Sequence, residues 1–142
     1  MSRQSTGVPI ENIQEEHSTT APINATATAT ADQVATGYIT STSAQATTIT
    51  LPTGTLLGQR LGAKRGTVFN LYVDNTAGAN PVTMAVATNG IQSNFDLEIT
   101  AATASVTPAA ITPLTVPSGV TGLARYTLVF SSPTAYTFTR TA

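Results

Sequence analysis

The sequence contains no cysteine and no tryptophan, only one histidine, and few charged residues. Without cysteine, neither a disulfide framework nor a thiolate metal site can form. Only 9% of the residues are charged, and the formal net charge is -1. Proteins that wrap nucleic acid use Lys and Arg to displace counterions from phosphates, so this charge balance argues against a nucleic-acid partner.

Long apolar segments are also missing. No run approaches the roughly 20 apolar residues that cross a bilayer, and the N-terminus lacks the apolar core of a signal peptide. We therefore expect no membrane partner and a protein that assembles from the cytoplasm.

Threonine, rather than any charged residue, is the commonest polar residue of this chain. There are 29 threonines, and with Val and Ile the β-branched residues number 47 of 142. These side chains are stiff at χ1 and fit a pleated sheet better than a helix. A surface of Thr, Ser and Ala is neutral and low in side-chain entropy, which suits permanent contact with neighbouring proteins.

From Val34 onward, apolar and polar residues alternate with the period of half-buried strands. Residues 47–52, 67–74, 81–88 and 95–99 each follow this pattern. The turn-forming residues at 75–80 predict that the second and third of these runs form a hairpin. Asp96 and Glu98 lie on the polar face of the fourth run, where two acids are more typical of a soluble face than of a catalytic pair.

A second hairpin is predicted at the C-terminus. Leu128 and Phe130 share one strand face, as do Tyr136 and Phe138 on the next run. Directly opposed residues in an antiparallel pair point the same way, so the connection around 131–135 must contain an odd number of residues. Loops of three or five residues meet this condition.

Strands at intervals of about ten residues, with turns between them, predict an all-β fold. We expect an antiparallel β-sandwich over residues 34–142, with jelly-roll connectivity as one option. Residues 1–33 form an N-terminal arm that is extended or ordered by a partner. A solvated tail would leave three apolar side chains exposed to water, so we expect these residues to contact a partner: Ile10, Ile13 and Ile23. The Ala-Thr alternation at 25–31 could add as an edge strand to a neighbour.

The glycine-rich segment 54–67 holds half of the basic residues, namely Arg60, Lys64 and Arg65. It is not a phosphate-binding loop of the GxxxxGK[ST] type, because alanine precedes the lysine and arginine follows it. Two interpretations stay open. The segment is either a flexible loop that meets an acidic partner surface or a solvated connection.

Catalytic constellations are not evident. The single histidine, His17, lies in the expected arm, and no GxSxG nucleophile elbow occurs. We interpret His17 as a solvated tail residue. We expect no enzyme activity, no metal site and no cofactor.

The run from Ile49 to Gly90 resembles a pattern found in structural proteins of tailed-bacteriophage heads. There, a threonine-rich strand ending in Leu-Pro leads to a glycine-rich loop, then a strand of the form TxFxxxVxNT and a turn. The matching positions are Leu51, Pro52, the loop from Gly54 to Gly66, Thr67, Phe69, Val73, Asn75 and Thr76. The similarity covers about a third of the chain, and residues 101–122 have no counterpart in it.

This resemblance implies a capsid decoration, or cement, protein. Such proteins are small β-sandwiches, often trimeric, that bind the outside of an icosahedral shell and lock its capsomers together. The implied partners are the major capsid protein and further copies of the chain, with a trimer favoured. The implied location is the virion surface. An N-terminal arm that reaches a neighbouring subunit would suit residues 1–33.

Other classes of function remain open. A phage fibre or spike segment, or a carbohydrate-binding module, would present exposed aromatics that stack on sugars. There is no Trp, and two of the four tyrosines are assigned to the terminal hairpin, which leaves Tyr38 and Tyr72. A major capsid protein of a small virus is a further option, but the chain is short and lacks a strongly basic arm for packaging a genome.

Overall fold

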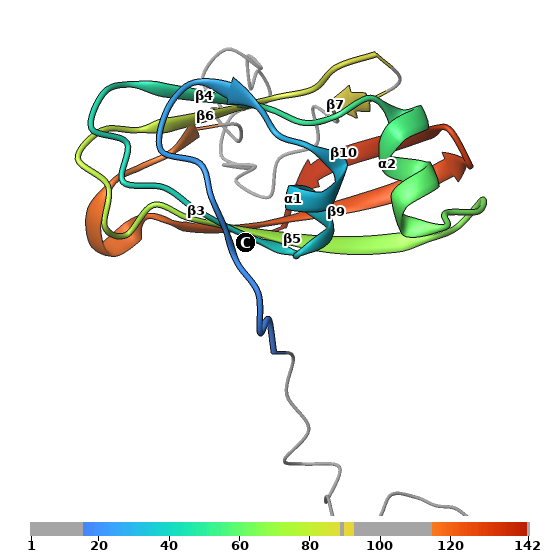
Figure 1. Ribbon diagram of the computed structural model, residues 1–142, viewed down its shortest axis with the longest axis horizontal. Helices are drawn as coiled ribbons and strands as arrows, with labels where there is room; N and C mark the ends of the chain where they lie inside the picture. The colour runs from blue at the N-terminus through green and yellow to red at the C-terminus, as the bar shows by residue number, and fades with distance from the viewer. Residues whose placement is uncertain (1–15, 89, 93–114, 142) are drawn as a thin grey trace, which may run out of the picture.

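The computed structural model describes residues 16–88, 90–92 and 115–141, which form two β-sheets with a shared core between them (Figure 1). Sheet A has the strand order β1-β3-β5-β9-β10-β7, and sheet B has the order β2-β4-β6-β8. The strands of sheet A are β1 (Ala21–Pro22), β3 (Tyr38–Thr40), β5 (Val68–Asp74), β7 (Gly90–Gln92), β9 (Leu123–Ser132) and β10 (Ala135–Arg140). Those of sheet B are β2 (Ala27–Thr28), β4 (Thr47–Thr50), β6 (Val82–Ala85) and β8 (Thr115–Val116).

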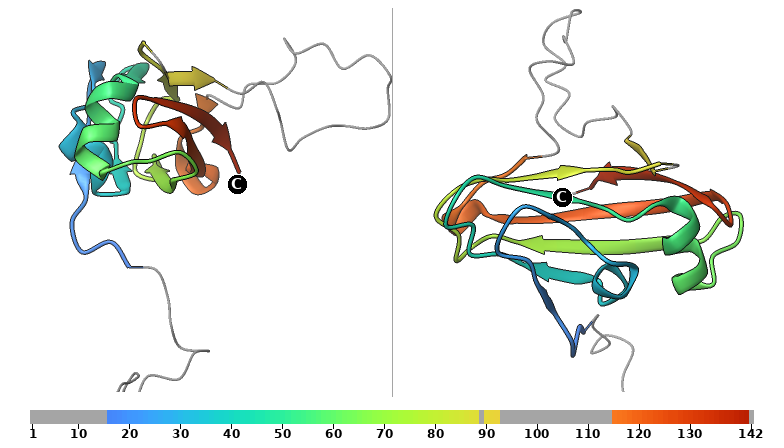
Figure 2. Two further views of the ribbon diagram at one scale, coloured as in Figure 1. Left: turned by 90° about the vertical axis from the view of Figure 1, so that its right-hand side faces the viewer. Right: turned by 45° about the horizontal axis from the view of Figure 1, so that its top comes forward.

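The first half of the fold is a coil that passes three times from sheet A to sheet B. β1, β3 and β5 lie side by side and parallel in sheet A, and β2, β4 and β6 do the same in sheet B. Helix α1 (Ala31–Ala35) follows β2, and helix α2 (Gly54–Leu61) follows β4. The two helices lie against each other at one side of the sheets, as the views in Figures 1 and 2 show.

The core is filled from both sheets. Ile39 and Leu71 enter it from sheet A, and Ile49 and Met84 enter it from sheet B, all with no exposed surface. Each fully buried side chain of this size contributes about 1.5–3 kcal/mol relative to an exposed one. The largest contribution comes from four stacked or tilted aromatic rings, those of Tyr126, Phe130, Tyr136 and Phe138.

The fold is rich in strands, as the sequence predicts, but the sheets are mixed rather than antiparallel. Parallel pairs join β1 to β3, β3 to β5, β2 to β4, β4 to β6 and β7 to β10. Jelly rolls are antiparallel architectures, so the expected jelly-roll connectivity does not describe this chain. An alternating pattern tells which face of a strand is buried but not which strand lies beside it, and this is why the prediction was wrong.

The hairpin predicted from residues 67–88 does not form. β5 and β6 belong to different sheets, and the connection between them, residues 75–81, crosses the edge of the molecule. The predicted faces are nevertheless right, because Leu71, Val73, Val82 and Met84 are all fully buried.

The C-terminal hairpin is confirmed with its predicted register. Phe130 pairs with Tyr136, and Leu128 pairs with Phe138. Five residues separate the first pair, as its parity requires, and the register shifts next to Ala135. The extra residue of this irregularity keeps the four aromatic rings on the core face.

Part of the predicted N-terminal arm belongs to the sheets. Residues 21–22 and 27–28 are β1 and β2, and Ile23 between them is only 5% exposed. The Ile23 amide donates to the Thr40 carbonyl at 2.8 Å. The boundary expected at residue 33 is therefore not seen in the described part of the chain, where residues 21–33 pack as the first turn of the coil.

The glycine-rich segment contains helix α2 rather than a loop. Thr53 caps its first turn by accepting a hydrogen bond from the Leu56 amide at 3.2 Å. Gly62 ends it in the left-handed conformation, with φ of 62°. Gly58 lies so close to the β9–β10 turn that a Cβ there would be 1.8 Å from the Pro133 carbonyl oxygen. Glycine is thus required by packing, although its abundance suggested a loop.

A buried polar cluster closes the opposite side of the coil, where the chain leaves β3 and β5. The side-chain amide of Asn75, which has no exposed surface, donates to the carbonyls of Asn80 at 2.8 Å and Pro117 at 3.1 Å. Its oxygen accepts from the Ser43 hydroxyl at 2.9 Å. One side chain therefore joins three connections that are distant in the sequence.

Candidate functional site around the N-terminal segment

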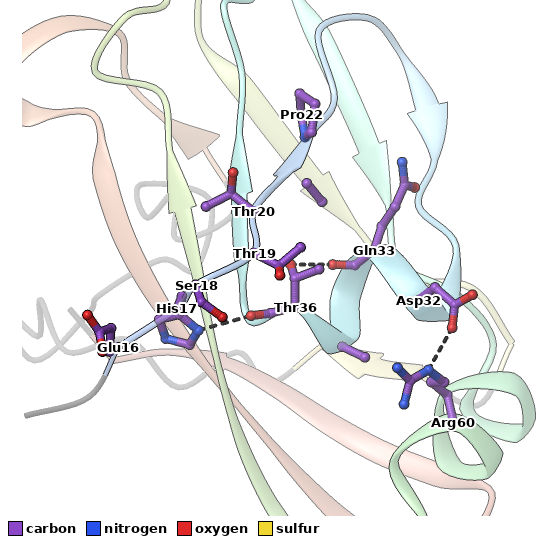
Figure 3. A pocket seen from close by; sticks show the side chains of 12 residues that line it. Glu16, His17, Ser18, Thr19, Thr20, Pro22, Asp32, Gln33, Thr36 and Arg60 are labelled. Carbon is purple, nitrogen blue, oxygen red and sulfur yellow. Dashed lines mark hydrogen bonds and ion pairs between the residues drawn. The ribbon is translucent and has the colours of Figure 1, made fainter.

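A groove of 660 Å³ lies between the N-terminal segment, helix α1 and the exposed side of helix α2 (Figure 3). Residues 16–22 form one wall and residues of α1 form the other. Arg60 reaches the groove from α2. The lining residues are Glu16, His17, Ser18, Thr19, Thr20, Ala21, Pro22, Asp32, Gln33, Ala35, Thr36 and Arg60.

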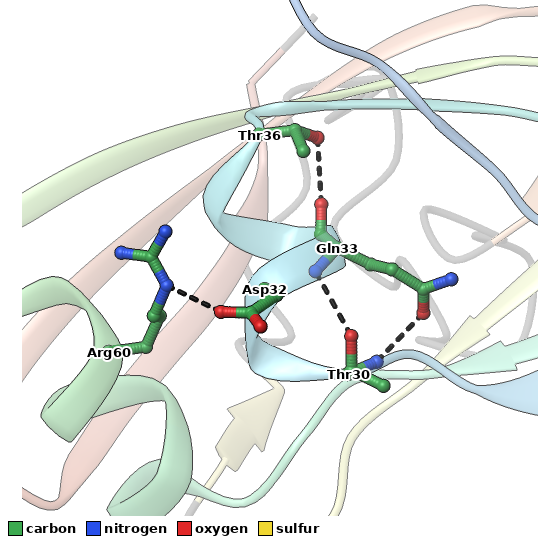
Figure 4. Close-up of polar contacts among 5 residues, drawn as sticks. All are labelled: Thr30, Asp32, Gln33, Thr36 and Arg60. Carbon is green, nitrogen blue, oxygen red and sulfur yellow. Dashed lines mark hydrogen bonds and ion pairs between the residues drawn. The ribbon is translucent and has the colours of Figure 1, made fainter.

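Helix α1 is short but firmly capped, and this fixes the groove wall (Figure 4). The Thr30 hydroxyl accepts from the Gln33 amide at 3.1 Å, and the Gln33 side chain accepts from the Thr30 amide at 2.9 Å. This reciprocal pair is a capping box, which satisfies two of the orphan donors at the helix start. Asp32 of this helix accepts a hydrogen bond at its Oδ1 from the Arg60 Nε of α2, at 2.6 Å.

The Asp32–Arg60 ion pair links the two helices but contributes little to stability. The Arg60 side chain is 52% exposed and that of Asp32 is 83% exposed. Exposed pairs of this kind contribute at most about 1 kcal/mol, because water and salt screen them. The pair orients the Arg60 guanidinium at the groove, and its other nitrogens stay accessible.

His17 anchors the N-terminal segment to sheet A. Its Nδ1 lies 2.9 Å from the Thr36 carbonyl oxygen. The centroid of its ring lies 5.9 Å from that of Tyr38 and 5.5 Å from that of Tyr72. The ring also lies over Gly37, where a Cβ would come within 2.6 Å of it. The interpretation of His17 as a solvated tail residue was therefore wrong. Its only sequence signal is the glycine before Tyr38, which has a positive φ of 77°.

Tyr38 and Tyr72 stack at 6.0 Å on the outer face of sheet A, at positions directly opposite in the register. The Tyr38 hydroxyl donates to Asp74 at 2.7 Å. Burial, this hydrogen bond and the Asp74 charge together raise the pKa of Tyr38 to about 12. Burial by itself would raise the pKa of Asp74, but hydrogen bonds from Thr76 and Tyr38 hold it below its usual value.

These contacts limit what the tyrosine pair can do chemically. Sugar-binding platforms need an open aromatic face. Here His17 packs against both rings, and the Tyr38 hydroxyl is already bonded to a carboxylate. Across the described residues, no three His, Asp or Glu side chains come together in a group that could hold a metal ion. The described helices include none long and apolar enough to cross a membrane.

The basic residues predicted as partner contacts gather at one end of α2. Arg60 lies in its last turn, and Lys64 and Arg65 follow in the exposed connection to β5. Neither Lys64 nor Arg65 forms an ion pair with any other described residue. The Lys64 amide donates to the Thr67 hydroxyl at 2.9 Å, which fixes the connection.

The three predicted isoleucine contacts have different outcomes. Ile23 is part of the core of its own chain, so its side chain is not available to a partner. Ile10 and Ile13 lie outside the described residues, as do Asp96 and Glu98. Contact of Arg60, Lys64 and Arg65 with a partner stays a prediction, and nothing in the sequence indicated the groove, which depends on His17 and α1.

Comparison with known proteins adds no assignment. No family model, no curated protein and no solved structure matches the chain.

Proposed function

We propose that the chain is a structural virion protein of the capsid decoration, or cement, class, which binds the outside of an icosahedral phage head. The observation that carries this proposal is a groove bordered by an anchored N-terminal segment and by α2, the helix that leads into two exposed basic residues. His17 and Glu16 border the same groove as Arg60, and Lys64 and Arg65 follow α2 in the connection to β5. We call this surface, comprising the groove with Lys64 and Arg65, the binding end.

The chemistry of the binding end favours a protein surface with acidic groups as its partner. Arg60 is held by Asp32, whereas Lys64 and Arg65 are exposed and have no described acidic partner. Complementary charge of this kind speeds encounter and fixes orientation more than it adds affinity. The anchor at His17 fixes the point at which the described part of the N-terminal segment meets helix α1 and sheet A.

The rest of the surface supports a role in permanent assembly. The outward-facing residues of sheet B are mainly threonine, including Thr28, Thr50 and Thr83, and the chain is close to neutral. Such a surface repels neighbouring proteins only weakly. In an icosahedral shell, many modest contacts repeated by symmetry provide stability without a deep pocket.

Binding to shells tests the proposal. The full chain is mixed with empty shells assembled from the major capsid protein encoded in the same genome, and binding is measured by co-sedimentation. We expect saturable binding with a fixed number of copies per capsomer. Replacing Lys64 and Arg65 together by glutamine should weaken binding about tenfold, since each charged contact at an exposed rim contributes at most about 1 kcal/mol.

The matched control places the same change in net charge elsewhere. Thr42 and Thr83 are exposed; Thr42 lies in the connection after β3, on the opposite side of the coil from the two helices, and Thr83 lies on the outer face of sheet B. Replacing both by glutamate also lowers the net charge by two. This control should bind nearly as well as the wild type. Equal weakening in both variants would show that only the overall charge matters, and absence of any binding by the wild-type chain would refute the proposal.

A further inference from the structure

Among the described residues, no strand pairs with the outer edge of β2 in sheet B. β2 pairs with β4 in parallel, with Ala27 opposite Ile49 and Thr28 opposite Thr50. The Ala29 amide donates to the Thr50 carbonyl at 2.8 Å. In a parallel pair, alternate residues turn their N–H and C=O groups to the same neighbour. Ala27 and Ala29 therefore face β4, and the backbone groups of Thr28 face away from the sheet.

The corresponding edge of sheet A is blocked. β1 pairs with β3 in the same way, and the Ile23 amide donates to the Thr40 carbonyl. By the same alternation, the outward-facing residue of β1 is Pro22, which has no N–H to offer. Proline at this place is a common protection of edge strands. Pro22 and Thr28 thus hold equivalent positions at the two edges, but only Thr28 has a backbone N–H that could bind a further strand.

The far edge of sheet B is also occupied. An Arg140 guanidinium nitrogen lies 3.3 Å from the carbonyl oxygen of Thr115 in β8 and donates to it. At two of the other three sheet edges, a described residue hinders further pairing: Pro22 at β1 and Arg140 at β8. No described residue does so at β2.

The edge formed by β2 lacks charge as well. No charged residue occurs from Ser18 to Ala31. Natural proteins usually place charges, above all lysine, on exposed edges to prevent pairing between chains. Extended backbone continues from β2 to Thr30, whose φ is -78° and ψ is 160°. An uncharged, extended and unblocked edge is suited to pairing with another strand.

We propose that β2 pairs with β2 of a second copy of this chain, antiparallel and about a twofold axis that passes beside Thr28. The Thr28 residues of the two copies then exchange both backbone hydrogen bonds, and Ala27 of each lies opposite Ala29 of the other. This joins the two copies of sheet B into one eight-stranded sheet.

Two features of the strand favour a second copy as its partner. The Ala-Thr alternation from Ala25 to Ala31 is the same read in either direction about Thr28, so the faces of both strands match. Ala27 is exposed although it shares the inner face with Ile49, which is fully buried. Ala29 of a second copy would cover Ala27, and no charge on either strand would oppose the approach.

The proposal does not depend on a capsid partner. An isologous contact of this kind closes as a dimer, so it predicts two copies in solution rather than the trimer that the resemblance implies.

The test is the mass of the full chain, measured by sedimentation velocity over a range of concentrations. We expect a reversible dimer for the wild type and for Thr28→Val, which keeps the N–H. Thr28→Pro removes that N–H and should raise the dimer dissociation constant about tenfold or more. Pro22 shows that the equivalent backbone accepts proline, so circular dichroism and the unfolding midpoint of the variant should stay close to those of the wild type.

A second variant keeps the test independent of proline. Thr28→Lys places two like charges at the twofold axis and should also produce monomers at low salt. A wild-type chain that is monomeric at every concentration would overturn the proposal. So would a dimer or trimer whose mass is the same in the wild type, Thr28→Pro and Thr28→Lys.

Discussion

Replacing Asn75 by alanine is expected to lower the free energy of unfolding by about 3 kcal/mol or more. Asn75 has no exposed surface, and its amide bonds to Asn80, Pro117 and Ser43. Its removal takes the amide donor from the Pro117 carbonyl, takes one of their partners from Ser43 and Asn80, and adds a cavity. A buried polar group left unpaired costs about 1–3 kcal/mol, and the cavity adds to this. Urea unfolding followed by circular dichroism measures the loss.

Asn70 provides the matched control for this substitution. It lies on the same strand, β5, but is only half-buried, and its side-chain oxygen accepts a single bond from the Thr127 hydroxyl at 2.9 Å. Asn70→Ala should cost about 1 kcal/mol. If Asn75→Ala cost no more than Asn70→Ala, the polar cluster would not be what holds the three connections together.

Replacing Gly58 by alanine is expected to destabilise the protein by about 3 kcal/mol, although alanine is the better helix former. In an open helix this substitution gains about 1 kcal/mol. Here the new Cβ would lie 1.8 Å from the Pro133 carbonyl oxygen and 3.0 Å from its carbonyl carbon. Backbone atoms cannot rotate away, so α2 or the β9–β10 turn must shift, and overpacking of this kind typically costs about 1–3 kcal/mol or more.

The same substitution at Gly62 separates packing from backbone conformation. A Cβ at Gly62 would meet nothing within 4 Å, but its φ is 62°, so alanine there should cost only the strain of about 1–2 kcal/mol. Thermal unfolding of both variants gives the comparison. A smaller loss at Gly58 than at Gly62 would mean that α2 does not rest on the hairpin as the structure places it.

The buried faces of the strands could be predicted from the sequence, but their neighbours could not. Leu71 and Val73 are buried because hydrophobic alternation is a local property that one strand carries by itself. Whether β5 pairs with β6 or with β3 depends on where the connections run. The turn-forming residues at 75–80 allow both a hairpin and a crossing between sheets, so sequence reasoning chose the commoner one.

Helix α2 was missed because local and tertiary requirements conflict there. Glycine disfavours a helix, and three glycines occur here, at positions 54, 58 and 62. Two of them have a structural reason to be glycine. Gly58 meets a neighbouring backbone, and Gly62 ends the helix. Only the Thr53 cap and the spacing of Leu57 and Leu61 could have indicated a helix, and eight residues are too few for a clear period.

The exposure of Lys64 and Arg65 could be predicted from the sequence, because charged side chains without a partner stay in water. Their contact with a partner stays a prediction. The anchoring of the N-terminal segment was not predictable. It depends on His17 meeting Gly37 and Tyr38, about 20 residues later, and on Tyr72 from a third strand. Such a contact appears only once the parallel coil is known.

The most direct test of the proposed cement function is the temperature at which empty shells fall apart. Shells of the major capsid protein from the same genome are heated with and without saturating amounts of the full chain, and disruption is followed by light scattering and electron microscopy. A cement protein bound across capsomers should raise the disruption temperature by several degrees, because ligands that bind only the intact state stabilise it. An unchanged disruption temperature at full occupancy would contradict the account.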